Sequence, residues 1–119
     1  MEDEGCYTTN IGKVGKILMS LKHEDDSSMY PTCATAATAI HEFMHILGFE
    51  HEHNRPDRDD FVIFHKNNAM SDAIAQYNKN RKEDVRFDMA PYDYLSVMHY
   101  EALAASNNGK PVLERKQGD

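Results

Sequence analysis

Three histidines and one glutamate lie within eleven residues, at a spacing that suits a catalytic metal ion. The stretch from His41 to His51 reads H-E-x-x-H-x-x-G-x-x-H. On a helix, His41 and His45 project from the same side, so one metal ion can take a nitrogen from each. Gly48 accepts left-handed dihedrals at little steric cost, so it can end the helix and let the chain bring His51 to the same ion. Three such ligands leave the fourth position of a tetrahedral zinc ion open for water, as in catalytic sites.

Glu42 has the position of a general base. It directly follows a predicted ligand and should not itself bind the ion. Zinc lowers the pKa of a bound water from ~15.7 toward ~7, so a nearby carboxylate can take its proton at neutral pH. The water would then attack a polarised carbonyl, and the protonated Glu42 would pass its proton to the departing amine. These residues therefore predict peptide-bond hydrolysis.

A simpler interpretation is a solvated helix whose opposite face belongs to the core. Such an apolar face exists, and its members recur at helical spacing. They are Ala36, Ile40, Phe43, Met44 and Leu47. This interpretation explains the apolar residues and leaves the three histidines unexplained. The extension of H-E-x-x-H by a glycine and a third histidine favours the metal site.

Two further segments extend the motif into a resemblance to the astacin family of zinc endopeptidases, a branch of the metzincins. Residues 48–52 read G-F-E-H-E, and residues 55–59 read R-P-D-R-D. They fit the family patterns G-F-x-H-E and R-x-D-R-D. Residues 92–100 read Y-D-Y-L-S-V-M-H-Y and fit the family's Met-turn segment. The resemblance runs from about Gly5 to Val112, which is nearly the whole chain.

The resemblance implies a role for each matching residue. The ligands of one zinc ion per chain would be His41, His45 and His51. Glu42 would be the general base, and Met98 would form an apolar floor beneath the metal. Tyr100 would be an additional, movable ligand that swings away and donates a hydrogen bond to the oxyanion of the transition state.

Three more residues gain structural roles from the resemblance. Glu52 would occupy the position that pairs with the new N-terminal ammonium after propeptide removal. Cys6 and Cys33 would form a disulfide, which suits an oxidising, extracellular setting, whereas two buried free thiols are the alternative. The resemblance thus implies a secreted protein. The acidic start at residues 1–4 does not look like a secretory signal.

The remaining histidines and nearby tyrosines are expected to be structural. His99 is interpreted as a histidine with satisfied hydrogen bonds. Tyr92 and Tyr94 are interpreted as packing residues with a hydroxyl at the surface. Surface or loop positions are expected for His23, His53 and His65, and none of these is predicted as a ligand.

Composition limits the class of partner. The chain has 119 residues, with 13 basic and 20 acidic side chains and a net charge of −7. Nothing in this balance favours a nucleic acid or an anionic membrane as a partner, and the motif predicts a protein or peptide substrate. No apolar run approaches the ~20 residues that a membrane span needs. The sequence carries no signal for an oligomeric state.

The motif is predicted to lie on a helix at residues 34–47, with Thr32 or Thr35 as its cap. Two short strands are predicted before it, at 6–11 and 14–21. Further expectations are a turn between Gly12 and Gly15, a polar loop at 22–31, a brief extended or helical segment at 61–64, a helix at 67–80, a charged surface stretch at 79–86, a short helix or loop at 100–105 and a loosely held tail at 106–119.

These elements and the resemblance predict an α+β fold of the zincin or metzincin type. The active-site helix would pack on a small, truncated β-sheet, and an irregular C-terminal subdomain would contain the Met-turn. Residues 1–119 would form one partial peptidase domain, with 5–51 as its upper part and 52–119 as its lower part. It would be partial because catalytic domains of the astacin family are much longer.

Three functions compete. The first is a secreted, zinc-dependent endopeptidase of the astacin type. The second is a zinc-binding but inactive fragment or pseudo-enzyme of the same fold. The third is a different metzincin or a thermolysin-like enzyme, against which the positions of Tyr100 and Glu52 both argue. The intact set of catalytic residue types favours the first function, and the short chain favours the second.

Overall fold

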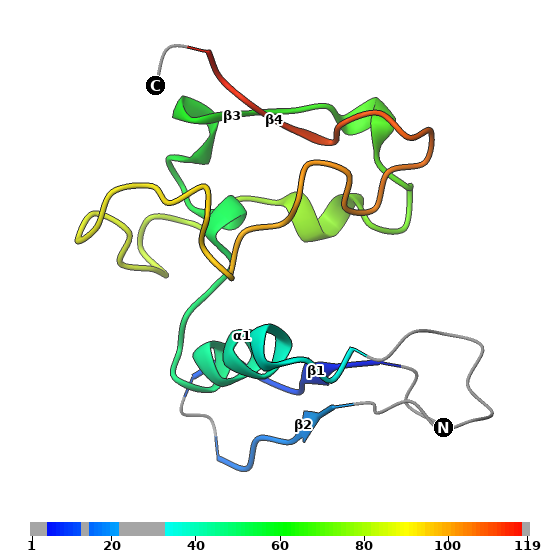
Figure 1. The fold of residues 1–119 in the computed structure, drawn as a ribbon. Helices are drawn as coiled ribbons and strands as arrows, with labels where there is room; N and C mark the ends of the chain where they lie inside the picture. Colours follow the sequence, from blue (N-terminus) through cyan, green and yellow to red (C-terminus); the bar gives the residue numbers. More distant parts are fainter. Residues whose placement is uncertain (1–4, 13–14, 22–32, 118–119) are drawn as a thin grey trace, which may run out of the picture. The chain divides into compact units, whose positions relative to one another are not determined.

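The structure is a computed structural model, and it describes residues 5–12, 15–21 and 33–117. Within these ranges the elements are β1 (Tyr7–Thr8), β2 (Met19–Ser20), α1 (Ala36–Ile46), the 3-10 helices η1 (Glu52–Asn54), η2 (Arg58–Asp60), η3 (Lys66–Asn68) and η4 (Ile74–Tyr77), and the strands β3 (Val62–Phe64) and β4 (Leu113–Arg115). The chain divides into two compact units, residues 1–50 and 51–119 (Figure 1). The predicted loop at 22–31 lies outside the described residues, as do His23 and Thr32.

The first unit contains α1 and a short antiparallel ribbon. Strand β1 pairs with β2 in the register Tyr7 opposite Ser20 and Thr8 opposite Met19, so both strands are shorter than predicted. Helix α1 lies against β1, as predicted for a helix on a small sheet (Figure 1). The predicted disulfide is confirmed, since Cys6 and Cys33 are bonded. It ties the residue before β1 to the segment that leads into α1.

Both ends of α1 follow from local sequence signals. Thr35 is the N-cap, and its hydroxyl accepts a hydrogen bond from the amide of Thr38 at 3.1 Å, which satisfies an amide at the helix start. At the other end, Gly48 has a φ of +102°. Its amide donates to the carbonyl of His45, and the amide of Phe49 donates to the carbonyl of Met44, each at 2.9 Å. This pair of bonds is a Schellman motif, in which glycine is favoured.

The apolar face of α1 is not covered in the way that its periodicity predicts. Ile40 and Phe43 are more than half exposed, and Leu47 is 74% exposed. The buried residues of the helix are instead Glu42 and His45. In the described part of the first unit, the helix meets a ribbon with two residues per strand, which is too small to cover a stripe of three turns. The expected core face is therefore wrong for this chain.

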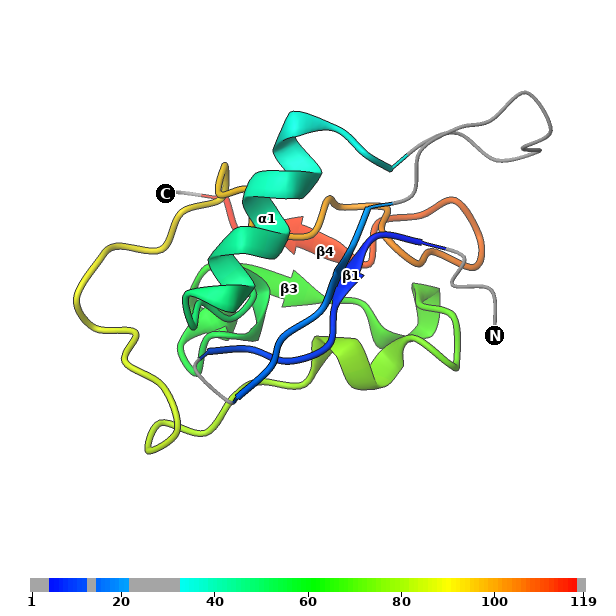
Figure 2. The same cartoon turned by 90° about the horizontal axis from the view of Figure 1, so that it is seen from below.

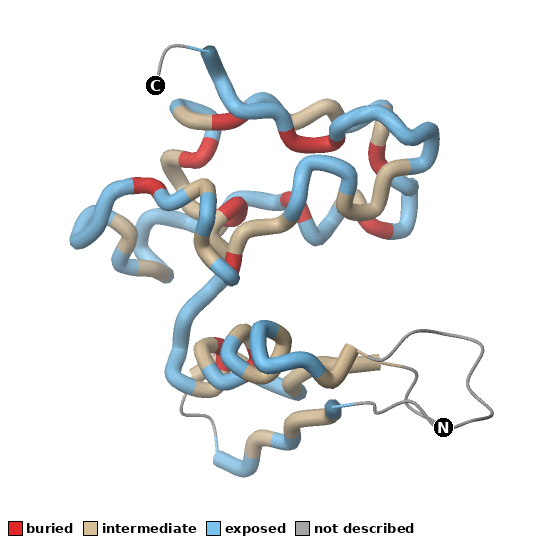
Figure 3. The backbone as a smooth tube through the Cα atoms, in the orientation of Figure 1, coloured by how far each residue is buried: buried red, intermediate tan, exposed pale blue. Residues whose placement is uncertain are grey.

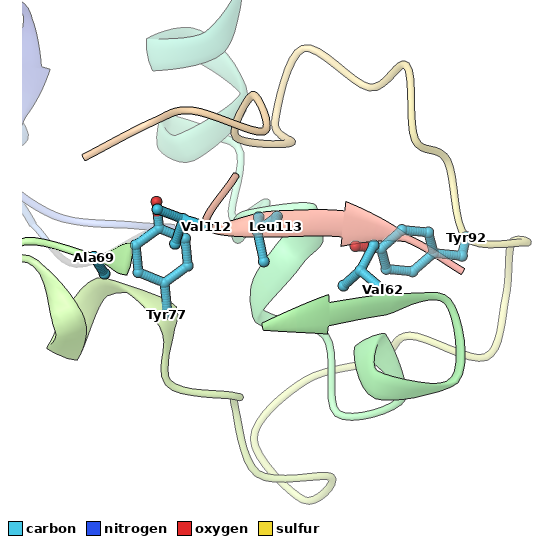
Figure 4. Close-up of a cluster of buried hydrophobic side chains, with 6 residues drawn as sticks. All are labelled: Val62, Ala69, Tyr77, Tyr92, Val112 and Leu113. Atoms are coloured by element: carbon cyan, nitrogen blue, oxygen red, sulfur yellow. The ribbon is translucent and has the colours of Figure 1, made fainter. Parts of the chain in front are cut away.

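The second unit holds the apolar core. Strand β3 pairs with β4 in an antiparallel register, Ile63 opposite Glu114, and the two strands run side by side in Figures 1 and 2. The buried cluster consists of Val62, Ala69, Tyr77, Tyr92, Val112 and Leu113 (Figure 4). In the tube coloured by burial, most of the buried positions lie on this unit (Figure 3).

Two expectations for this unit are wrong. Residues 67–80 form no continuous helix; they contain most of η3, all of η4 and a turn at 71–73 between them. Around Ala69, main-chain groups bond to a distant segment, since the amide of Met70 donates to the carbonyl of Ala105 at 2.8 Å. The tail is also not loose, because Val112 and Leu113 are buried in the core and Leu113 is the first residue of β4. Within the predicted segment 61–64, Val62–Phe64 form the strand β3, so the extended option is the one observed.

In the described ranges, no helix combines the length and the apolar character that crossing a membrane requires.

Candidate metal centre and active site

Helix α1 brings the first two predicted ligands together. The Nε2 atoms of His41 and His45 lie 3.1 Å apart, and their ring planes are nearly perpendicular at 87°. Two nitrogens bound to one tetrahedral zinc ion at ~2.0–2.1 Å are about 3.3 Å apart. The separation of these two atoms is therefore close to that of two ligands of one ion.

The hydrogen bonds of His45 fix its tautomer. Nδ1 lies 2.7 Å from the carbonyl oxygen of Phe49, and a carbonyl can only accept, so Nδ1 carries the ring proton. Nε2 is left with a lone pair, which is the form of the ring that binds a metal. The hydrogen bond from Nδ1 also holds the ring in place. The main chain of His45 is also tied, because the amide of Gly12 donates to its carbonyl at 2.8 Å.

The turn after α1 brings the third histidine into the group. His41, His45 and His51 each offer one ring nitrogen, and these nitrogens lie within 4.8 Å of one another. Neutral imidazole nitrogens suit zinc well, and three of them leave a coordination position for a non-protein ligand. The donor set therefore fits one zinc ion. The prediction of a three-histidine group able to bind one metal ion is confirmed.

Glu42 is buried, with 6% of its surface exposed, although it sits on a helix whose apolar residues are largely exposed. It follows the first predicted ligand, His41, directly in the sequence. A carboxylate removed from water interacts more strongly with nearby charges than one in solvent, because the local dielectric constant is lower. A cation bound by the neighbouring histidines would therefore act strongly on this group.

Tyr100 lies beside His51 in the second unit. The centroids of the two rings are 5.0 Å apart, and the Tyr100 hydroxyl donates to Oε1 of Gln76 at 3.0 Å. The ring of His53 lies close to both rings, with its centroid 4.1 Å from that of Tyr100 and 5.1 Å from that of His51. The predicted residue Tyr100 is thus held by aromatic and polar contacts next to a predicted ligand.

His53 is fully buried, so the expected surface position is wrong. Its Nδ1 accepts from the amide of Tyr100, and its Nε2 donates to the carbonyl of Gln76, each at 3.3 Å. Burial, which is the largest cause, and the nearby ring of His51 together lower the pKa of His53 to about 3. The neutral ring therefore links two main-chain segments. The sequence around His53 did not predict its burial or its hydrogen bonds, because both partners are distant in sequence.

The Met-turn segment packs against the residues that follow His51. Met98 is buried, and its carbonyl accepts from the amide of Glu52 at 3.0 Å. The carboxylate of Glu52 accepts from Arg55 at 3.1 Å and from the amide of Asp93 at 2.9 Å. In the described part, Glu52 joins the segment after the third predicted ligand to the start of the Met-turn.

The other aromatic residues of this segment make structural hydrogen bonds, and Tyr92 makes its bond with His99. Nδ1 of His99 lies 2.6 Å from the carbonyl of Tyr100, so it carries the proton and Nε2 accepts from the Tyr92 hydroxyl at 2.7 Å. His99 has the satisfied bonds that were expected. Tyr92 is buried, as expected for a packing residue, and burial raises the pKa of its phenol. The Tyr94 hydroxyl donates to the carbonyl of Phe61.

A buried arginine, Arg58, had no role assigned from the sequence and stabilises this region. Arg58 donates from Nη1 to the carbonyls of His53 at 3.0 Å and of Tyr77 at 2.7 Å. Its guanidinium lies over the ring of Phe64 and also bonds Asp59. The signal in the sequence was the R-P-D-R-D segment, which fits the family pattern but was given no role of its own.

Comparisons with known proteins agree with this geometry. The model of the peptidase family described as Astacin matches residues 1–119. Zinc metalloproteinase nas-8 of Steinernema carpocapsae is 38% identical over 114 residues, which is 96% of this chain and 25% of that protein. Zinc metalloproteinase nas-7 of Caenorhabditis elegans is 43% identical over 111 residues, which is 92% of this chain and 27% of that protein.

A solved structure shares the fold. High choriolytic enzyme 1, a hatching enzyme zinc-protease from Oryzias latipes, superposes with a TM-score of 0.81 at 29% identity. The match covers 99% of this chain and 55% of the hatching enzyme chain, so this chain spans about a quarter of the two relatives and about half of that structure. The predicted α+β, metzincin-like fold is confirmed. From the three-histidine group and the match along its whole length, the chain belongs to the astacin family.

Proposed function

We propose that this chain carries the active centre of a zinc-dependent endopeptidase. The observation that carries the proposal is the group of three ring nitrogens within 4.8 Å of one another, on the H-E-x-x-H-x-x-G-x-x-H segment. Family membership and relatives that are zinc metalloproteinases support it. The substrates would be proteins or peptides, and the disulfide between Cys6 and Cys33 supports a secreted protein.

The zinc ligands would be His41, His45 and His51. Zinc held there would supply a Lewis acid that polarises the scissile carbonyl and acidifies water. The chain's own contribution begins with the rigidity of His45, whose ring and main chain are both bonded. A ligand fixed in this way loses little further freedom when it binds, so the site is preorganised.

Glu42 would act as the general base. It would take a proton from the attacking water and return it to the leaving amine, so that one carboxylate serves both proton transfers. Its burial supports this role, because a carboxylate shielded from bulk water retains the proton for the second transfer. Such a group typically contributes about 10²–10⁴-fold to the rate.

Tyr100 would donate a hydrogen bond to the oxyanion that develops on the substrate. Its ring packs beside His51, which supports a position at the reacting centre. A phenol is a donor that remains protonated at neutral pH, and such donors stabilise developing negative charge. Met98 would close the apolar side of the site, which its burial supports.

A second candidate is a zinc-binding module without peptidase activity. The exposed apolar residues of α1 favour it, because they indicate a helix with incomplete cover in this chain. The two candidates predict the same zinc content. They differ in whether the loaded chain cleaves a peptide.

The test combines metal analysis with cleavage of an unstructured peptide. We expect the wild-type chain to bind zinc at one ion per chain and to cleave. Glu42→Gln should keep the zinc and lose about 10²–10⁴-fold in turnover. Glu50→Gln, on an exposed residue of the same motif, is the matched control and should retain activity.

Unchanged cleavage by Glu42→Gln would contradict the general-base role. Full zinc loading without any cleavage by the wild-type chain, or by a version extended at both ends, would favour the inactive module. Tyr100→Phe should lower kcat much more than it changes KM. Equal changes in both constants would assign Tyr100 to packing alone.

A further inference from the structure

The phenol of Tyr100 is held by a side chain outside the proposed catalytic set. Its hydroxyl donates to Oε1 of Gln76 at 3.0 Å, across 24 residues of sequence. Gln76 lies on η4 and is exposed, while Tyr100 lies at the end of the Met-turn segment. The same phenol ring packs beside His51. A neutral amide therefore bonds the hydroxyl that is proposed to serve the reaction.

Main-chain contacts fix both partners independently of the Gln76 side chain. The carbonyl of Gln76 accepts from Nδ2 of Asn54 at 2.8 Å and from Nε2 of His53 at 3.3 Å. The amide of Tyr100 donates to the other nitrogen of His53. Because these bonds use main-chain atoms of Gln76 and Tyr100, replacing the side chain of Gln76 should leave both segments in place.

A phenol has a single O–H proton to donate. While Tyr100 donates it to Gln76, it cannot donate it to an oxyanion. We propose that Gln76 is a positioning residue whose amide oxygen competes with the reacting substrate oxygen for the proton of Tyr100. The inference rests on the proposed function, since that function gives Tyr100 its role. A bond that persists in the enzyme–substrate complex and is absent from the transition state lowers kcat and leaves KM unchanged.

The kinetic test is a double-mutant cycle on the zinc-loaded chain. Gln76→Ala should raise kcat about two- to tenfold, the equivalent of one neutral hydrogen bond, with KM unchanged. In the Y100F background the same change should have no effect. Gln76→Glu keeps an acceptor and makes it charged, so it should lower kcat further with Tyr100 present than in the Y100F background. Gln117→Ala is the matched control and should leave kcat unchanged.

A spectroscopic test needs no turnover. The chain is labelled with ¹³C at Cζ of tyrosine, and the Tyr100 signal is assigned from its loss in Y100F. Gln76→Ala should shift this signal, whereas the signals of Tyr77 and Tyr92, whose hydroxyls bond Ala104 and His99, should not move. Gln117→Ala should move none of the three.

The two tests separate the inference from the proposed function. A wild-type chain that binds zinc and cleaves nothing contradicts the proposed function, and the Cζ signal still decides whether Gln76 holds the phenol. An unmoved Tyr100 signal overturns the inference. A fall in kcat for Gln76→Ala, or an equal change in the presence and absence of the Tyr100 hydroxyl, overturns it as well.

Discussion

Nδ1 of His45 lies 2.7 Å from the carbonyl oxygen of Phe49. This contact places the ring proton on Nδ1 and leaves Nε2 ready to bind a metal. The carbonyl is in reach because Gly48 turns the chain with a φ of +102°. The residue that ends α1 therefore also orients a proposed metal ligand, which would couple helix termination to metal binding.

Replacing Gly48 with alanine should weaken both stability and zinc binding. The added Cβ would meet Cα of Gly12 at 3.7 Å, an ordinary contact, so the cost arises from the positive φ and is about 1–2 kcal/mol. We expect a lower free energy of unfolding in urea and a weaker zinc affinity in competition with a chelator.

Gly109→Ala is the matched control for this prediction. Gly109 also has a positive φ, of +73°, and lies in a turn of the second unit away from the motif. It should lose comparable stability and keep the zinc affinity of the wild type. If Gly48→Ala kept that affinity as well, the proposed coupling would be wrong.

Removal of zinc should destabilise the chain. A metal that binds only the folded state at a free concentration of about 100 times its Kd adds about 2.7 kcal/mol to stability. A chelator should therefore lower the Tm of the wild type and leave the Tm of His45→Ala nearly unchanged. His65→Ala, in a histidine that pairs with Glu114, should respond to chelator like the wild type. An equal Tm with and without chelator in the wild type would argue against a zinc-coupled fold.

Asp59 should make stability fall in acid. Burial acts to raise its pKa, but hydrogen bonds from Lys79 and Arg58 outweigh this and hold the pKa below the ordinary value of 3.8. The folded state therefore favours the charged form. Its contribution is complete above about pH 4 and is lost as the pH falls through the folded pKa, below 3.8.

Asp59→Asn should flatten the dependence of the unfolding free energy on pH below about pH 4. Urea titrations at a series of pH values measure this slope. Asp60→Asn changes a neighbouring carboxylate in the same 3-10 helix and should keep the slope of the wild type. A slope that is unchanged in Asp59→Asn would mean that the ion pairs with Lys79 and Arg58 are not kept in solution.

Arg58→Met should destabilise the second unit by about 3 kcal/mol, since it leaves two buried carbonyls without a charged donor. These are the carbonyls of His53 and Tyr77. Urea denaturation measures the loss. Arg81→Met removes an exposed arginine that pairs with Asp84 and should have little effect. Similar losses in both variants would mean that burial of Arg58 adds nothing to its role.

The sequence predicted α1 well because its signals are local. The expected helix at 34–47 is observed as Ala36–Ile46, with Thr35 as the cap and Gly48 at the turn. The histidine spacing needs only the geometry of one helix and one turn. The three-histidine group was therefore predictable from a segment of eleven residues.

The errors lie where distant segments decide the structure. Residues 67–80 have helical periodicity, yet the main chain at Met70 bonds Ala105, and this interaction replaces helical bonds. Two apolar residues, Val112 and Leu113, were too few to distinguish the tail from a loop, although they complete the core beside β3. Periodicity also identified the apolar residues of α1, but it could not predict that most of them are exposed.

His53 was mistaken for a surface residue for a related reason. Its partners, Gln76 and Tyr100, lie 23 and 47 residues away. A histidine buried through such contacts has no characteristic spacing. Burial of the imidazole follows only once the segments that supply the carbonyl and the amide are in place.

The amide of Glu52 reaches the carbonyl of Met98 at 3.0 Å, and both atoms belong to the polypeptide main chain. This tether does not depend on the identity of the methionine side chain. A leucine or an isoleucine at that position would keep it, provided that the loop retains its path. The shape of the loop itself rests on short polar residues, because Ser96 accepts from the amide of Met98 and Asp93 accepts from that of Leu95. A mutational scan of this loop should therefore find serine and aspartate less replaceable than the methionine after which such loops are named.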